Sequence, residues 1–173
     1  MFRHVAAAMV LTISLGLSRP AAAEPMYQYI GALRSGLPHG EGTLTLEDGT
    51  VMSGTWVNGK LNGKGKHARP DGTTYEGDFV NGKKNGQGTA VHSDGEKYIG
   101  GWKDDKRHGY GVATNKVRGT KYEGEWFAGK ITGKGKLTLA DGTTFEGQFL
   151  DGVPQGRGIC TTAEDPTPQE CTG

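Results

Sequence analysis

Apolar and polar positions alternate along short segments of this chain, and glycine-containing turns separate the segments. In residues 74–80, Tyr75, Gly77 and Phe79 fall on one side of an extended backbone. Glu76 and Asp78 fall on the other side. Alternation with a period of two residues, with aromatic side chains on one face, predicts a half-buried β-strand.

A turn and a return strand follow this predicted strand. Asn81-Gly82 suits a tight hairpin turn, because asparagine and glycine adopt the positive φ angles that such a turn requires. Residues 88–92 form the predicted return strand, and Asp94-Gly95 turns the chain into the next segment. The sequence therefore predicts one β-hairpin in this stretch.

The same pattern recurs about every 23 residues along the chain. A glycine follows the leading large residue two positions later in all six units, and a Gly-x-Gly pair follows in all six. The leading positions are Tyr29, Met52, Tyr75, Tyr98, Tyr122 and Phe145. An aromatic face is predicted from Tyr75, Phe79, Tyr98, Trp102, Tyr122, Trp126, Phe145 and Phe149.

The repeated segments YEGDFVNGK (75–83), YEGEW (122–126) and RHGYG (107–111) resemble MORN repeats (membrane occupation and recognition nexus). The resemblance covers residues 29–160, with units starting near residues 29, 52, 75, 98, 122 and 145. Leu33 replaces the second aromatic residue in the first unit, and Met52 replaces the first in the second unit. The resemblance implies membrane apposition, anionic-lipid contact, protein scaffolding or dimerisation.

Six hairpins predict an all-β fold, an elongated and twisted single antiparallel sheet of about 12 strands and about 55 Å. No unit buries its own aromatic face alone, so each must be stabilised by its neighbours. Gly77 lies between two aromatic positions, and we expect its missing side chain to leave room for a ring of a neighbouring unit.

Residues 1–23 are predicted to be a signal peptide. Arg3 and His4 precede the apolar stretch 5–17, and the small residues 21–23 suit cleavage after Ala23. An uncleaved anchor is the alternative. The expected product is exported, periplasmic or secreted, with residues 24–28 as a short lead-in to the array.

Residues 161–173 are predicted to be a polar tail that caps the array. Cys160 and Cys171 bracket it, and two nearby cysteines in an exported chain favour a disulfide. A loop of this size contributes about 3 kcal/mol if it is unstrained. Two free thiols remain the alternative. The tail would then cover the edge of the last strand.

Composition and charge narrow the functional classes. Glycine accounts for 31 of 173 residues, and its regular placement argues against a disordered chain. There are 20 Lys and Arg against 19 Asp and Glu, and removal of Arg3 and Arg19 with the leader gives a net charge of −1. This bulk charge gives no reason to expect a nucleic-acid partner.

The basic residues concentrate after the second large residue of each unit, so stacked hairpins are predicted to carry one basic edge. The aspartates of the Asp-Gly turns would lie on the opposite edge. This basic edge could contact anionic head groups or another polyanion, or it could simply be solvated. Its candidate binding residues are Lys60, Lys64, Lys83, Lys84, Lys106, Arg107, Lys130 and Lys134.

Catalytic and metal-binding patterns do not stand out. Residues 77–83 read GxxxxGK like a phosphate-binding loop, but Lys84 follows where that loop needs Ser or Thr. His39 and His108 lie three units apart and suit turn positions rather than a shared metal. We therefore expect no enzyme activity, no cofactor and no metal.

The favoured hypothesis is an exported, non-catalytic scaffold that binds a protein through its aromatic face and basic edge, with self-association as a further expectation. One alternative is a peripheral binder of anionic membrane lipid or of an envelope polyanion. Another is an accessory subunit of an enzyme.

Overall fold

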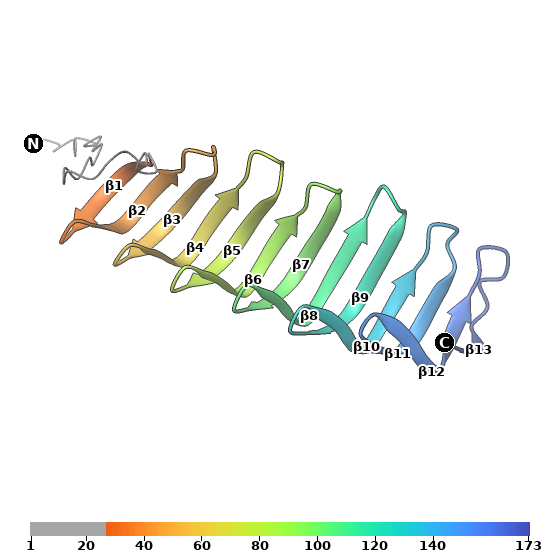
Figure 1. Ribbon diagram of the computed structural model, residues 1–173. Helices are drawn as coiled ribbons and strands as arrows, with labels where there is room; N and C mark the ends of the chain where they lie inside the picture. The colour runs from red at the N-terminus through yellow and green to blue at the C-terminus, as the bar shows by residue number, and fades with distance from the viewer. Residues whose placement is uncertain (1–26) are drawn as a thin grey trace, which may run out of the picture.

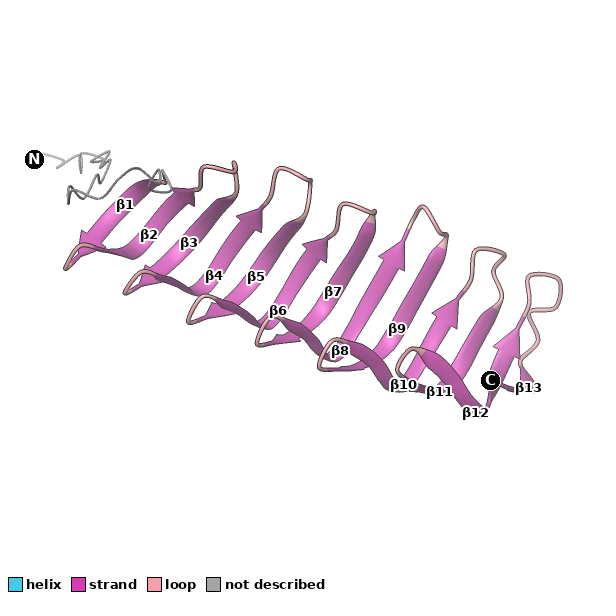
Figure 2. Ribbon diagram, in the orientation of Figure 1, coloured by secondary structure: helices cyan, strands magenta, loops and turns pink. Residues whose placement is uncertain are grey.

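The computed structural model describes residues 27–173 as one antiparallel sheet of 13 strands, each paired with its neighbours in the sequence. Strands and turns alternate along the whole described chain (Figures 1 and 2). The predicted signal peptide and most of the lead-in lie outside the described residues. The strands are β1 (Gln28–Arg34), β2 (Leu37–Thr45), β3 (Val51–Val57), β4 (Lys60–Ala68), β5 (Thr74–Val80), β6 (Lys83–Val91), β7 (Glu96–Lys103), β8 (Lys106–Asn115), β9 (Thr120–Phe127), β10 (Lys130–Thr138), β11 (Thr144–Leu150), β12 (Val153–Thr161) and β13 (Gln169–Thr172).

The predicted all-β class and the single open sheet of stacked hairpins are confirmed. The sequence indicated about 12 strands, and the thirteenth is supplied by the tail. Residues 169–172 carry no aromatic alternation, so nothing local marks them as a strand. They pair with β12, where Gly158 lies opposite Cys171 and Cys160 opposite Gln169.

Six short turns define one long edge of the sheet, which we call the short-turn edge. At Asn81-Gly82 the φ angles are 52° and 81°. Positive φ at both central residues matches the right-handed twist of the flanking strands. The N–H of Gly82 then donates to the carbonyl oxygen of Leu61 in the preceding hairpin at 2.8 Å. Each short turn after the first is therefore tied to the unit before it as well as to its own strands.

Longer turns define the opposite edge, the long-turn edge. The Asp71 carboxylate accepts the N–H of Thr73 at 2.7 Å, and Asp48 and Asp141 accept the N–H of Thr50 and Thr143 in the same way. These hydrogen bonds favour the ionised form, so they lower the pKa of all three carboxyl groups. An aspartate at this position thus closes the turn by bonding to backbone two residues ahead.

One line of glycines crosses the sheet from β1 to β11 and places strand backbones in close contact. It comprises Gly31, Gly42, Gly54, Gly65, Gly77, Gly88, Gly100, Gly111, Gly124, Gly135 and Gly147, each opposite the next. The expectation for Gly77 was wrong in one respect. A Cβ there would meet Gly88 Cα at 2.5 Å and the Tyr75 hydroxyl at 2.7 Å, both within its own unit.

Pairing within each hairpin contains a shift in register, whereas pairing between hairpins does not. Between β5 and β6 the shift falls between Gly77 and Phe79, while β4 and β5 pair without interruption. A β-bulge bends its strand and increases the local twist. The repeated shift therefore curls every hairpin in the same direction, toward its aromatic side.

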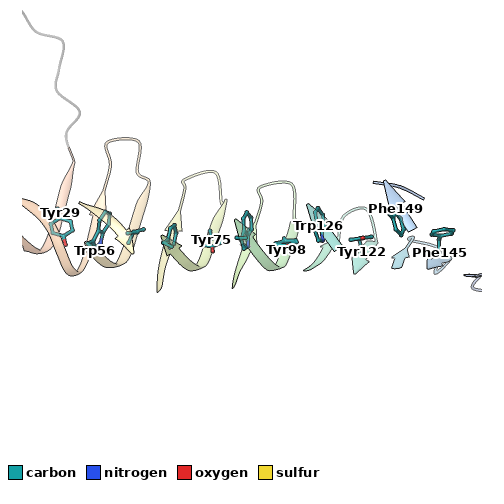
Figure 3. Packing of buried hydrophobic residues seen from close by; sticks show 12 residues of the cluster. Tyr29, Trp56, Tyr75, Tyr98, Tyr122, Trp126, Phe145 and Phe149 are labelled. Atoms are coloured by element: carbon teal, nitrogen blue, oxygen red, sulfur yellow. The ribbon is translucent and has the colours of Figure 1, made fainter. Parts of the chain in front are cut away.

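The aromatic side chains form one continuous core along the array (Figure 3). The Tyr75 ring packs edge-on against Phe79 of its own unit, with ring centres 5.1 Å apart, and against Trp102 of the next unit at 5.2 Å. Tyr98 and Tyr122 repeat this arrangement. Edge-to-face pairs of this kind add about 0.5–1.5 kcal/mol beyond the burial of area. Each tyrosine thus links its own unit to the next.

The C-terminal end carries the predicted disulfide. Cys160 in β12 and Cys171 in β13 are joined, with their Cα atoms 5.9 Å apart. Both cysteines pack against the aromatic core. The bond holds β13 along the outer edge of β12, which shortens the exposed edge at this end of the sheet.

Candidate interaction surfaces

The aromatic face is a core and does not form a surface for a partner. Tyr98 is 0% exposed, and the other seven predicted aromatic-face residues are also buried. The curl of each hairpin encloses the rings, which Figure 3 shows between the two arms of the ribbon. Binding of a partner to these rings, as first expected, would require the hairpins to open.

The eight predicted basic-edge residues do not share one edge, because strand alternation divides them among three locations. Lys60, Lys83, Lys106 and Lys130 each begin a strand directly after a short turn. Lys64 and Lys134 lie further along their strands on the face opposite the aromatic core, which we call the polar face. Lys84 and Arg107 lie on the aromatic side.

Lys84 and Arg107 each cover a pair of core rings. The ammonium nitrogen of Lys84 lies 4.8 Å from the centre of the Tyr75 ring and 4.9 Å from that of Trp102. Burial disfavours the charged amine and lowers the pKa of Lys84. The guanidinium carbon of Arg107 lies 5.0 Å from the centre of the Tyr98 ring and 5.0 Å from that of the Trp126 ring. These cations close the aromatic core and are not displayed on an edge.

On the polar face, lysines are paired with carboxylates of the next strand. Lys64 Nζ lies 2.7 Å from the Asp78 carboxylate, and Lys66 Nζ lies 3.0 Å from that of Glu76. The hydrogen bond from Lys64 is the main cause of a lowered pKa at Asp78. Exposed pairs such as these add little to stability, but they leave much of the polar face locally neutral.

The short-turn edge mixes cations with exposed apolar side chains. On the polar side of this edge, the residues that flank the turns form what we call the short-turn rim. Two ion pairs between successive turns reduce the positive charge of this rim. Lys83 Nζ lies 3.7 Å from the Asp104 carboxylate, and Lys130 Nζ lies 2.8 Å from the Asp151 carboxylate. The rim consists of Arg34, Leu37, Val57, Lys60, Val80, Lys83, Lys103, Lys106, Phe127, Lys130, Leu150 and Val153.

An open groove runs over the glycine line on the polar face. One cavity of about 950 Å³ extends from Ile30 to Ile99, and a second of about 600 Å³ from Tyr110 to Ile159. Glycine backbones form the floor in both, because the side-chain positions along the glycine line point to the aromatic side of the sheet. Charged and polar side chains alternate along the walls, and these four apolar residues are exposed. The sequence did not predict the groove, because the residues that line it on the polar face vary from unit to unit, whereas the aromatic side repeats.

No helix within residues 27–173 has the length and apolar character needed to cross a membrane. No group of three or more His, Cys, Asp or Glu side chains in that part of the chain is arranged to hold a metal ion.

Comparison with solved structures returns matches to many chains. One is described as the SAS-4 (dCPAP) TCP domain in complex with a proline-rich motif of Ana2 (dSTIL) of Drosophila melanogaster. It shares 11% sequence identity, covers 93% of this chain and 99% of its own, and has a TM-score of 0.48. No curated protein sequence matches this chain.

The family model of the MORN repeat matches residues 29–51, 53–74, 75–97, 98–115, 122–144 and 145–164. These matches cover most of the chain and follow the six hairpins, from β1–β2 to β11–β12. The matched ranges contain the whole glycine line and the buried aromatic residues of the core. The chain is therefore a member of the MORN repeat family.

Proposed function

We propose that this chain is an exported, non-catalytic scaffold that binds a protein partner along the groove of the polar face. The observation that carries the proposal is the groove itself, which follows the glycine line through most of the array. Its exposed apolar residues are surrounded by charged side chains. An apolar centre with a polar rim is typical of protein interfaces.

Ile99 is the central apolar residue of the groove, and it lies directly opposite Val112 on the next strand. Tyr110, on the same strand as Val112, is 64% exposed. Isoleucine and tyrosine at the middle of a long groove suit the anchor of an interface, since a few central residues carry most of the binding energy. Charged walls would then fix the orientation of the partner.

A specific observation favours a second candidate, contact with an anionic membrane surface. Along the short-turn rim, exposed Val80, Phe127 and Leu150 alternate with lysines. Apolar tips that insert among head groups, next to lysines that contact anionic lipid, would suit an interfacial surface. The ion pairs of Lys83 and Lys130 argue against a strong effect.

Two matched substitutions separate these candidates. Ile99→Glu alters the groove and Val80→Glu alters the rim, at side chains of similar exposure, 49% and 47%. Affinity capture from the envelope fraction would identify co-purifying proteins for the wild type and both variants. The proposal predicts a protein that is retained by Val80→Glu and lost with Ile99→Glu. Retention of every captured protein by Ile99→Glu would contradict binding in the groove.

Flotation with liposomes, with and without anionic lipid and across a salt series, tests the second candidate. Reversal of Lys60, Lys83, Lys106 and Lys130 to Glu should abolish flotation if the rim binds lipid. Val80→Glu should weaken it, and Ile99→Glu should not. Absent or salt-insensitive binding would remove the membrane candidate. An accessory role beside an enzyme would instead appear as an enzyme among the captured proteins.

A further inference from the structure

The fourth hairpin, β7–β8, departs from the repeat at three positions on the aromatic side. Glu96 stands at a position where hairpins two, three, five and six carry threonine. Arg107 lies two residues after the short turn, at a position that is apolar in most other hairpins. The third position is Asn115, the last residue of β8. The turn that follows also contains one extra residue. The threonines are Thr50, Thr73, Thr120 and Thr143, and the counterparts of Arg107 are Pro38, Leu61, Lys84, Ile131 and Pro154.

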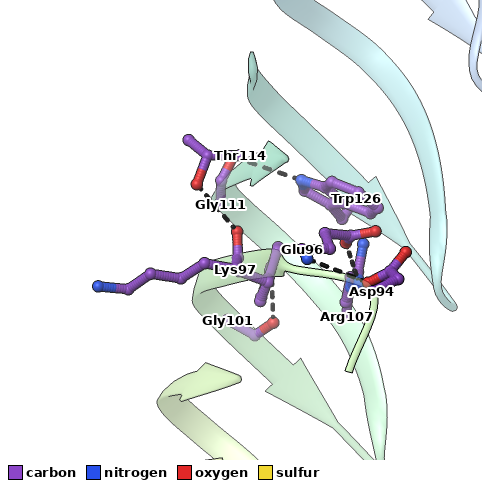
Figure 4. A network of polar contacts seen from close by, with 9 residues as sticks. Asp94, Glu96, Lys97, Gly101, Arg107, Gly111, Thr114 and Trp126 are labelled. Carbon is purple, nitrogen blue, oxygen red and sulfur yellow. Dashed lines mark hydrogen bonds and ion pairs between the residues drawn. The ribbon is translucent and has the colours of Figure 1, made fainter. Parts of the chain in front are cut away.

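These departures meet in space. Glu96 and Asn115 are opposite each other across β7 and β8, and the Glu96 carboxylate forms an ion pair with Arg107 (Figure 4). Asn115 is buried, and its Oδ1 accepts the N–H of Val117 at 3.1 Å and of Arg118 at 3.0 Å. A single polar cluster thus combines the altered strand positions with the longer turn.

A cavity of about 430 Å³ adjoins this cluster on the aromatic side. Its apolar floor contains Ala113, Trp126, Ile131 and Leu137. Two size changes leave this space open. Ala113, like Ala90 in the preceding unit, is smaller than the leucines that stand at this position as Leu44 and Leu137. Ile131 occupies the position from which Lys84 and Arg107 cover their rings. The volume lies in the range of small-molecule sites.

The charges around the cavity indicate the chemistry of its ligand. Arg107, Lys121 and Lys130 line it, but each is paired, with Glu96, Glu123 and Asp151 respectively. Arg118 also lines the cavity and forms no ion pair within residues 27–173. One uncompensated positive charge therefore lies beside an apolar floor.

We propose that this cavity binds a small amphipathic monoanion, such as a medium-chain carboxylate. Its carboxylate would pair with Arg118 and accept a hydrogen bond from Nδ2 of Asn115, whose Oδ1 is used by the turn. Its apolar chain would cover Ile131 and Leu137. The site is separate from the groove, which lies on the polar face of the sheet.

The three tryptophans of the chain provide a test with internal controls. Trp126 lines the cavity, and its indole N–H donates to the Gly111 carbonyl oxygen at 3.3 Å. Octanoate should be titrated into isotope-labelled protein while the three indole N–H signals are followed by NMR. The Trp126 signal should shift with saturation, and those of Trp56 and Trp102 should not. No shift, or equal shifts of all three signals, would overturn the proposal.

Three variants and one analogue complete the test. Arg118→Ala should weaken octanoate binding about tenfold, because a charge-assisted hydrogen bond is lost, whereas Lys116→Ala in the same turn should not. Ala113→Leu should abolish binding, and Leu44 and Leu137 show that the repeat accepts leucine there. Unchanged Trp56 and Trp102 signals would confirm that this variant is folded.

Octanol should bind at least tenfold more weakly than octanoate. Equal affinity of octanol, or undiminished binding to Ala113→Leu, would contradict the assigned site.

Discussion

At the scale of single residues, the glycine line is the most constrained feature of the molecule. Tyrosine or phenylalanine rings and neighbouring backbones occupy the space that any Cβ along this line would need. An added Cβ at Gly88 would lie 2.5 Å from Cε2 of Tyr75. These glycines are required by close contact, whereas those in the turns are required by their backbone angles.

Gly88→Ala should therefore destabilise the protein by about 2–3 kcal/mol, because the packed ring of Tyr75 has to move. Gly72→Ala is the matched control. Its φ is +85° and nothing lies within contact distance of an added Cβ, so only backbone strain of about 1 kcal/mol is expected. Urea unfolding of both variants measures the difference. Equal losses in the free energy of unfolding for both variants would show that contact with the Tyr75 ring does not set the cost of the substitution at Gly88.

Buried tyrosines should make the fold sensitive to alkali. Burial raises the pKa of Tyr98 and of Tyr122 to about 12, from the ordinary tyrosine value of 10.0. When folding raises the pKa of a tyrosine, the folded state favours the neutral hydroxyl. The resulting contribution to the free energy of unfolding is complete at any pH below the pKa of the unfolded chain. Stability should therefore be intact below about pH 10 and fall as the pH rises toward 12. Tyrosinate absorbance and circular dichroism, followed together, should show ionisation of these two residues only with unfolding.

Tyr98→Phe tests the contribution of one hydroxyl group. At neutral pH it should cost about 1 kcal/mol, because the hydrogen bond to the Gly101 carbonyl oxygen, at 3.0 Å, is lost. The alkaline loss of stability should become smaller, since one titrating group is removed. Phe145 occupies the same position in the last unit, so the ring itself is tolerated. An unchanged pH profile would contradict the assignment to Tyr98.

At the scale of elements, the last strand depends on a covalent bond. β13 has four residues and pairs only with β12. Cys160→Ser combined with Cys171→Ser should cost about 3 kcal/mol by the loop-entropy argument. Hydrogen exchange should then increase in β12 and β13. Because each unit contacts only its neighbours, protection in β3–β6 should not change, and loss of protection there would indicate a globally coupled sheet.

At the scale of the whole molecule, the array is modular. Removal of residues 75–97 would delete β6, all of β5 except Thr74, and the first two residues of β7, and would join Thr74 to Tyr98 at the same point of the repeat. The shortened chain should keep its circular dichroism spectrum and unfold cooperatively. Its free energy of unfolding should be lower by the contribution of one unit and of one interface between units. Loss of the β-sheet spectrum would show that the third unit has no equivalent neighbour to replace it.

Several features of the fold could be predicted from local sequence. Alternation around Tyr75, Gly77 and Phe79 predicted the strands, and Asn81-Gly82 predicted the turns. Repetition then fixed the order of the sheet. These features depend on neighbours within a few residues, and the backbone angles at the turns agree with them. The MORN family and the pairing of Cys160 with Cys171 were also indicated at this level.

The surfaces could be decided only by the tertiary structure. Bulges beside the glycine line curl each hairpin, so the aromatic face became a core and the polar face acquired the groove. Alternation separated Lys84 and Arg107 from the other cations, and β13 was placed by its disulfide. The cavity beside Asn115 is lined by the four adjacent strands β7–β10, by the longer turn and by two short turns. Each of these outcomes depends on contacts between units, which one repeat cannot encode alone.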